Sequence, residues 1–120
     1  MDGKPPGYDL EERAFQYALA VRSCIAGNKW SRVQWTDIDQ LLRSSGSVPA
    51  NYTETNNAVS KPDFLFRIRI AKKEANESKL WLRLLGATTQ CETTKATLRD
   101  LFKESDELAR ILATILRNSQ

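Results

Sequence analysis

A seam of apolar and small side chains between residues 64 and 85 constrains the fold of this chain more than any other feature. Its members recur at alternating steps of four and three residues: Phe64, Ile68, Ala71, Ala75, Ser78, Leu82 and Leu85. This spacing places them along one face of an α-helix, in the heptad pattern by which helices pack together. Ser60 as N-cap and Pro62 in the first turn mark the helix start, and Gly86 marks its end. We therefore predict a long helix whose small central residues admit a close neighbour.

Three further segments show helical periodicity. Asp9 and Glu12 have capping-box spacing and precede the first apolar stripe. A second stripe predicts a helix over residues 37–58 that is kinked near Pro49, because proline removes a backbone donor inside a helix. A third stripe predicts the last helix, from about residue 94 to residue 118. No segment alternates between apolar and polar residues as a half-buried strand does.

Four helices with short connections predict an all-α fold, an antiparallel up-down four-helix bundle. We expect the bundle domain to cover residues 9–118. Residues 1–8 are predicted to form a disordered leader, because Pro5, Pro6 and two glycines interrupt regular structure there. A chain of 120 residues is long enough for one hydrophobic core and too short for two.

Histidine is absent from the chain, and this narrows the chemistry available to a helical bundle. A histidine-based catalytic triad, a histidine-ligated zinc and the Glu-x-x-His pairs of di-iron bundles are excluded. The two cysteines, Cys24 and Cys91, form neither a CxxC motif nor a disulfide framework. The first residues lack the apolar core of a secretory signal, and no stretch approaches the ~20 apolar residues of a membrane span. We expect a cytoplasmic protein with reduced thiols and without metal, cofactor or membrane contact.

Several segments together resemble one bacterial protein family. They are residues 43–52 (RSSGSVPANY), 60–64 (SKPDF), 70–78 (IAKKEANES), 81–85 (WLRLL) and 104–108 (ESDEL). The chain resembles, over about residues 9–118, the four-helix-bundle proteins named after intervening sequences in 23S ribosomal RNA genes. The resemblance implies assembly as a homopentamer, with no enzymatic activity assigned and no catalytic residues to transfer. A similar pentameric bundle, the accessory variability protein of diversity-generating retroelements, binds nucleic acid and a reverse transcriptase.

Positive charge is concentrated on the third predicted helix. The whole chain carries 18 basic and 15 acidic side chains, whereas residues 61–85 carry seven basic and three acidic ones. Six of these cations form the candidate nucleic-acid surface: Arg67, Arg69, Lys72, Lys73, Lys79 and Arg83. Such a cluster favours contact with the phosphate backbone of RNA or DNA. The alternative is a solvated helix face with ordinary ion pairs, for example between Lys73 and Glu77.

Two further groups of side chains are candidates for specific roles. Arg43, Asn51, Glu74 and Glu77 lie near the small, polar stretches of the second and third helices, and we predict a structural polar network that sets helix register. The alternative interpretation makes Glu74 and Glu77 paired catalytic acids or metal ligands.

A second apolar stripe on the third helix consists of Phe66, Ile70, Trp81 and Leu84. Aromatic and apolar side chains are enriched at the centre of protein interfaces, so we interpret these four residues as an oligomer interface. Stacking of nucleic-acid bases on the aromatic rings is the alternative.

These observations favour a non-enzymatic homo-oligomer, pentameric by resemblance, with a nucleic-acid-binding surface on the third helix. The alternative is a protein-interaction module, or an accessory subunit for a partner such as a reverse transcriptase. An enzyme is disfavoured because the chain has no glycine-rich phosphate loop and no nucleophile motif.

Overall fold

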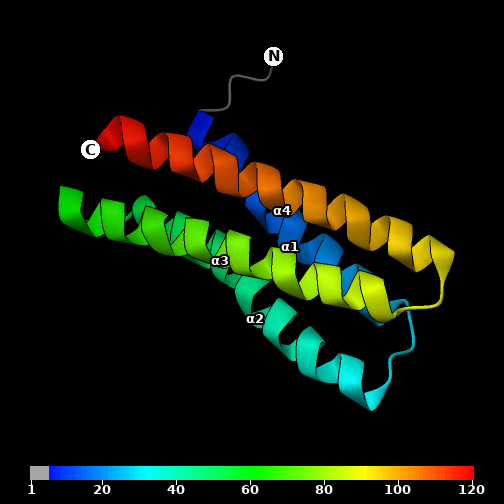
Figure 1. Ribbon diagram of the computed structural model, residues 1–120. Coiled ribbons are helices and arrows are strands. Elements are labelled where there is room, and N and C mark those ends of the chain that lie inside the picture. Colours follow the sequence, from blue (N-terminus) through cyan, green and yellow to red (C-terminus); the bar gives the residue numbers. More distant parts are fainter. Residues whose placement is uncertain (1–5) are drawn as a thin grey trace.

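The computed structural model describes residues 6–120, which form four helices joined by short loops. They are α1 (Pro6–Ala26), α2 (Arg32–Thr55), α3 (Lys61–Thr88) and α4 (Glu92–Ser119). No strand occurs in this part of the chain, which confirms the all-α bundle. In Figure 1 each helix runs back in the direction opposite to the one before it.

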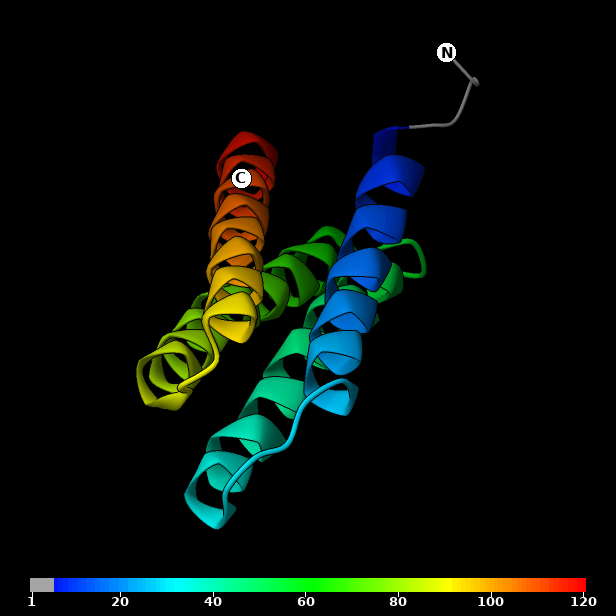
Figure 2. The ribbon, with the colours of Figure 1, turned by 90° about the vertical axis from the view of Figure 1, so that its right-hand side faces the viewer.

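In cross-section the four helices lie at the corners of a quadrilateral, and helices that follow one another in the chain are neighbours. α3 packs along both α2 and α4, and α1 contacts the same two helices. Figure 2, viewed from the side of the loops that leave α1 and α3, shows α1 and α4 in the upper part and α2 and α3 below them. α1 and α3 therefore lie diagonally opposite each other. Of the four helices, α3 has the most extensive contacts with its two neighbours.

The helix starts follow local capping chemistry. Ser60 caps α3 as predicted: its hydroxyl accepts from the backbone N–H of Asp63 at 3.2 Å. α2 begins at Arg32, ahead of the predicted residue 37, because Ser31 and Gln34 form a full capping box. The Ser31 hydroxyl accepts from the backbone N–H of Gln34. The side-chain oxygen of Gln34 accepts from the backbone N–H of Ser31 at 2.9 Å.

Two other boundaries differ from the sequence prediction. α1 begins at Pro6, ahead of Asp9, because the fixed φ of proline suits the first turn of a helix. The leader prediction for residues 1–5 lies outside the described residues. α3 continues through Gly86 to Thr88. α2 runs without a break through Pro49, between the buried side chains of Val48 and Tyr52, and the kink there stays a prediction.

The core is built on the predicted seam. From Ile68 to Leu85, every seam residue is buried, and Phe64 packs against the cluster from its edge. A layer of small and polar side chains crosses the middle of the core. The Tyr17 hydroxyl donates to Ser105 Oγ at 2.9 Å, and the Ser105 hydroxyl donates to the carbonyl of Ala75 at 2.7 Å. Burial raises the pKa of the Tyr17 phenol above its usual range.

Candidate nucleic-acid interface and the polar network beside it

The six predicted cations of α3 fall into two groups. Lys79 and Arg67 are committed to neighbouring helices: Lys79 Nζ donates to Asp106 Oδ1 of α4 at 2.9 Å, and Arg67 Nη1 donates to Asn51 Oδ1 of α2 at 3.2 Å. The remaining four form no ion pair within residues 9–120: Arg69, Lys72, Lys73 and Arg83. Three of these four are exposed, and Lys72 is half-buried. Their charge is available to an external anion.

The surface of α3 is divided lengthwise between its two neighbours. The flank toward α2 contains Arg67 and Trp81, which contact α2 or its network. The flank toward α4 contains Lys79 and Arg83, and Arg83 shares a groove with α4. The expected Lys73–Glu77 pair is not among the ion pairs of residues 9–120, because Glu77 faces Arg43 instead. Positive charge therefore follows the α4 flank and the outer face.

Sequence reasoning missed the contribution of α4 to this surface. Lys95 and Arg99 line the groove together with Arg83, and the cavity between them has a volume of about 340 Å³. The charges on α4 as a whole are balanced, so no local excess marked these two residues. Only the packing of α4 against α3 places them beside Arg83.

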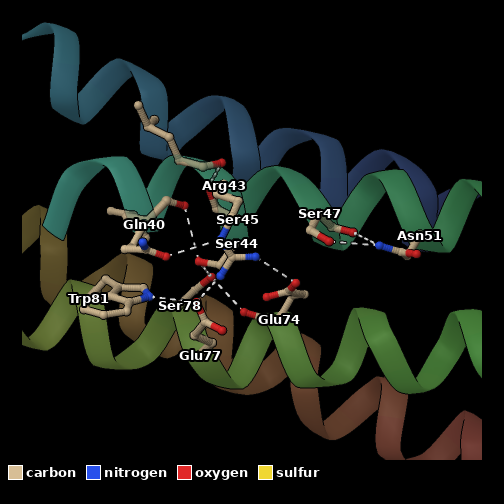
Figure 3. A network of polar contacts seen from close by, with 12 residues as sticks. Gln40, Arg43, Ser44, Ser45, Ser47, Asn51, Glu74, Glu77, Ser78 and Trp81 are labelled. Atoms are coloured by element: carbon tan, nitrogen blue, oxygen red, sulfur yellow. Dashed lines mark hydrogen bonds and ion pairs between the residues drawn. The ribbon is translucent and has the colours of Figure 1, made fainter. Parts of the chain in front are cut away.

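The predicted polar network forms at the α2–α3 contact, with one member displaced (Figure 3). Arg43 Nη1 donates to Glu74 Oε2 at 3.0 Å, and its other terminal nitrogen pairs with Glu77. Trp81 Nε1 donates to the same oxygen of Glu77 at 3.1 Å. The hydrogen bonds of Arg43 to Glu74, first, and to Glu77 raise the pKa of the Arg43 guanidinium. Arg43, Glu74 and Glu77 are thus brought together as a bridge between two helices.

Asn51 is not part of that bridge. It lies about two helical turns further along α2. Its amide donates to the carbonyl and the hydroxyl of Ser47, both at 2.9 Å, and its oxygen accepts from Arg67. A hydroxyl pair, Ser44 with Ser78 at 2.7 Å, occupies the buried side of the Arg43 bridge instead. Asn51 therefore links α2 and α3 through a cation, not through a carboxylate.

The carboxylates of the bridge are committed to Arg43 and Trp81, which leaves the acid-pair and metal-ligand interpretation without support. Among residues 6–120, no group of three or more His, Cys, Asp and Glu side chains is placed to hold a metal ion. The Glu74 side chain is 13% exposed, and its Oε1 has no hydrogen-bond partner in the described residues.

The two cysteines differ in their surroundings. Cys24 is buried, which raises the pKa of its thiol. Cys91 is exposed before α4, and the polar groups of the nearby Thr94 lower the pKa of its thiol.

The four predicted interface residues of α3 are unequally exposed. Phe66 is 53% exposed and Leu84 is 38% exposed, whereas Ile70 and Trp81 are half-buried. Leu80, which the sequence prediction did not include, is 50% exposed on the outer face of the same helix. None of the helices in residues 6–120 combines the length and the apolar character needed to cross a membrane.

These features define an all-α four-helix bundle. The family model described as 23S rRNA-intervening sequence protein matches residues 9–114, and the chain belongs to this family. A crystal structure of a protein of unknown function from Bacteroides thetaiotaomicron, assigned to the S23 ribosomal protein family, has the same fold. It is 26% identical, with a TM-score of 0.78 over 92% of this chain and 97% of that chain. No curated protein matches the chain.

Proposed function

We propose that the protein is a non-enzymatic homo-oligomeric scaffold that binds the phosphate backbone of RNA or DNA through α3. The observation that carries this proposal is the group of unpaired cations Arg69, Lys72, Lys73 and Arg83 on one helix. Each cation placed against a phosphate releases a condensed counterion, so affinity grows with the number of contacts and falls with salt. Membership of a family named for 23S rRNA intervening sequences makes ribosomal RNA the first ligand to test.

A charge-neutralised variant tests the proposal. In a mobility-shift assay with a 23S rRNA fragment, we expect Arg69→Gln/Lys73→Gln/Arg83→Gln to weaken binding at least tenfold. The slope of log affinity against log salt should fall by about 0.7–0.9 for each contact removed.

The matched control removes three exposed cations elsewhere: Lys29→Gln/Arg32→Gln/Arg117→Gln. It has the same net charge as the test variant and should keep nearly all of the affinity. Equal losses in both variants would mean that only net charge matters, and the assignment of the surface to α3 would be wrong.

We also propose that the exposed apolar side chains of α3 form the contact between protomers, with the pentamer as the expected assembly. Phe66 and Leu84 are exposed on the outer face of α3, the face that also carries Lys73, whereas Arg83 lines the groove shared with α4. Five chains of 13.6 kDa would give a particle of about 68 kDa.

Light scattering coupled to gel filtration measures the mass of the particle and so tests the proposed pentamer and its interface. Phe66→Glu/Leu84→Glu should shift the mass toward that of one chain, because a charge in an interface core is not compensated. Val59→Glu, at a loop residue that is 91% exposed, should leave the mass unchanged. A wild-type monomer would rule out the ring; the same side chains would then favour docking of a partner protein, such as a reverse transcriptase.

A further inference from the structure

The groove between the end of α3 and the start of α4 combines an apolar floor with a cationic rim. Leu82 and Gly86 of α3 and Leu98 and Phe102 of α4 form the floor, and Arg83, Lys95 and Arg99 complete the lining. The lining contains no carboxylate, and the cavity of about 340 Å³ is within the range that holds small ligands. A complementary occupant has a flat apolar body and an adjacent negative charge.

The three rim cations are free to meet such a charge. Arg83 and Arg99 are exposed and have no ion-pair partner in residues 9–120. Lys95 has one contact, to Glu92 at 3.5 Å, and the Glu92 side chain is 85% exposed. An exposed pair of this kind contributes little and can rearrange around a phosphate.

Gly86 leaves the α3 wall of the groove without a side chain. It lies inside α3, where glycine is unfavourable relative to alanine. A Cβ atom added at Gly86 would meet no protein atom within 4 Å, so packing does not require the glycine. The space that a side chain would enter is the groove itself, because Gly86 is part of its lining.

The groove also continues the basic flank of α3. Lys79 lies over the Phe102 ring at 5.9 Å, and Phe102 in turn lines the groove. Aromatic side chains beside a basic path are the arrangement by which proteins hold single-stranded nucleic acid, with bases stacked on rings and phosphates on cations.

We propose that this groove holds one unpaired nucleotide of a bound RNA or DNA strand, its base against Phe102 and its phosphates against Arg83, Lys95 and Arg99. This inference rests on the proposed nucleic-acid binding and adds to it a preference for unpaired segments. It assigns to Lys95 and Arg99 of α4 a role in binding that the charge of α3 alone does not predict.

Gly86→Leu fills the groove without removing a charge, and Ala87→Leu is the matched control at an exposed neighbour outside the lining. Fluorescence anisotropy would measure three probes: a 12-residue oligouridylate, a blunt-ended RNA duplex and free uridine monophosphate. We expect Gly86→Leu to bind the oligouridylate about tenfold or more weakly than wild type, with unchanged binding of the duplex. Phe102→Leu should show the same selective loss, and Ala87→Leu should behave as wild type.

The outcomes separate the two proposals. If Gly86→Leu binds the oligouridylate as wild type does, the groove is not a nucleotide site, and the proposed function is untouched. If wild type binds neither the oligouridylate nor the duplex, the proposed function fails and this inference fails with it. If free uridine monophosphate binds as tightly as the oligouridylate, the groove takes a free nucleotide, and its assignment to a strand is wrong.

Discussion

Arg43 is the residue that connects the carboxylates of α3 to α2. Its side chain is 49% exposed, whereas the Glu74 side chain is 13% exposed and the Glu77 side chain is 29% exposed. The three groups therefore differ in how much hydration they lose on folding. A buried carboxylate left without its cation costs more than an exposed cation left without its carboxylate.

We expect Arg43→Ala to lower the free energy of unfolding by about 1–3 kcal/mol, because Glu74 keeps its charge and loses its ion-pair partner. Adding Glu74→Gln to that variant should restore part of the loss, since a neutral amide is less costly to bury. Urea unfolding followed by circular dichroism measures both. If the double variant is no more stable than Arg43→Ala, burial of the Glu74 charge is not the cause.

The exposed fractions of Arg43 and Glu77 also change the loss of stability that we expect from Glu77→Ala. The sequence predicts a buried network, in which Glu77→Ala would cost a few kcal/mol. Because Glu77 and Arg43 are both partly hydrated, we expect about 1 kcal/mol, from the lost hydrogen bonds of Arg43 and Trp81.

At the scale of the element, α3 combines three surfaces in one helix. Its buried seam has small residues where the neighbouring helices come close: Ser78 meets Ser44 of α2, and the carbonyl of Ala75 accepts from Ser105 of α4. Its α2 flank holds the polar bridge, and its α4 flank and outer face hold the unpaired cations. The heptad seam made the first of these predictable. On the α2 flank, the sequence also predicted that Arg43 would contact a carboxylate of α3, whereas on the α4 flank it predicted the composition but not the contacts.

We expect Ala75→Leu to destabilise the bundle by about 1–3 kcal/mol or more, because Ala75 is fully buried and a larger side chain would push α4 away. Asn76→Leu makes a similar change at the next residue, which is exposed, and should change stability by less than about 0.5 kcal/mol. Thermal unfolding of the two variants provides the comparison. Equal melting temperatures would show that the small residue is not needed for close packing.

At the scale of the whole molecule, the four helices differ in how extensively they pack against the rest of the bundle. α3 has packed neighbours on two sides along its length, whereas α1 packs less extensively against α2 and α4. Part of the attachment of α1 is polar: Arg13 donates to both carboxylate oxygens of Glu104 at 2.8 Å and to Glu107 at 3.0 Å.

Amide hydrogen exchange should therefore be fastest in α1 and slowest in the centre of α3, because local opening is governed by buried contacts. Arg13→Ala should increase exchange in α1 specifically. Arg110→Ala, which breaks only an ion pair with Asp106 inside α4, should leave α1 unchanged. Uniform exchange over α1 and α3 in the wild-type protein would contradict this order.

The number of helices, the buried seam of α3, its cap at Ser60 and its excess of positive charge were determined by the sequence alone. Each of these is a property of one segment: a spacing, a terminal hydrogen bond or a sum of charges. The tertiary structure decided which side chains of different helices meet. It paired Asn51 with Arg67 instead of a carboxylate, and it placed Lys95 and Arg99 beside Arg83. Those contacts depend on the rotation and offset of one helix against the next, which no periodicity within a single helix contains.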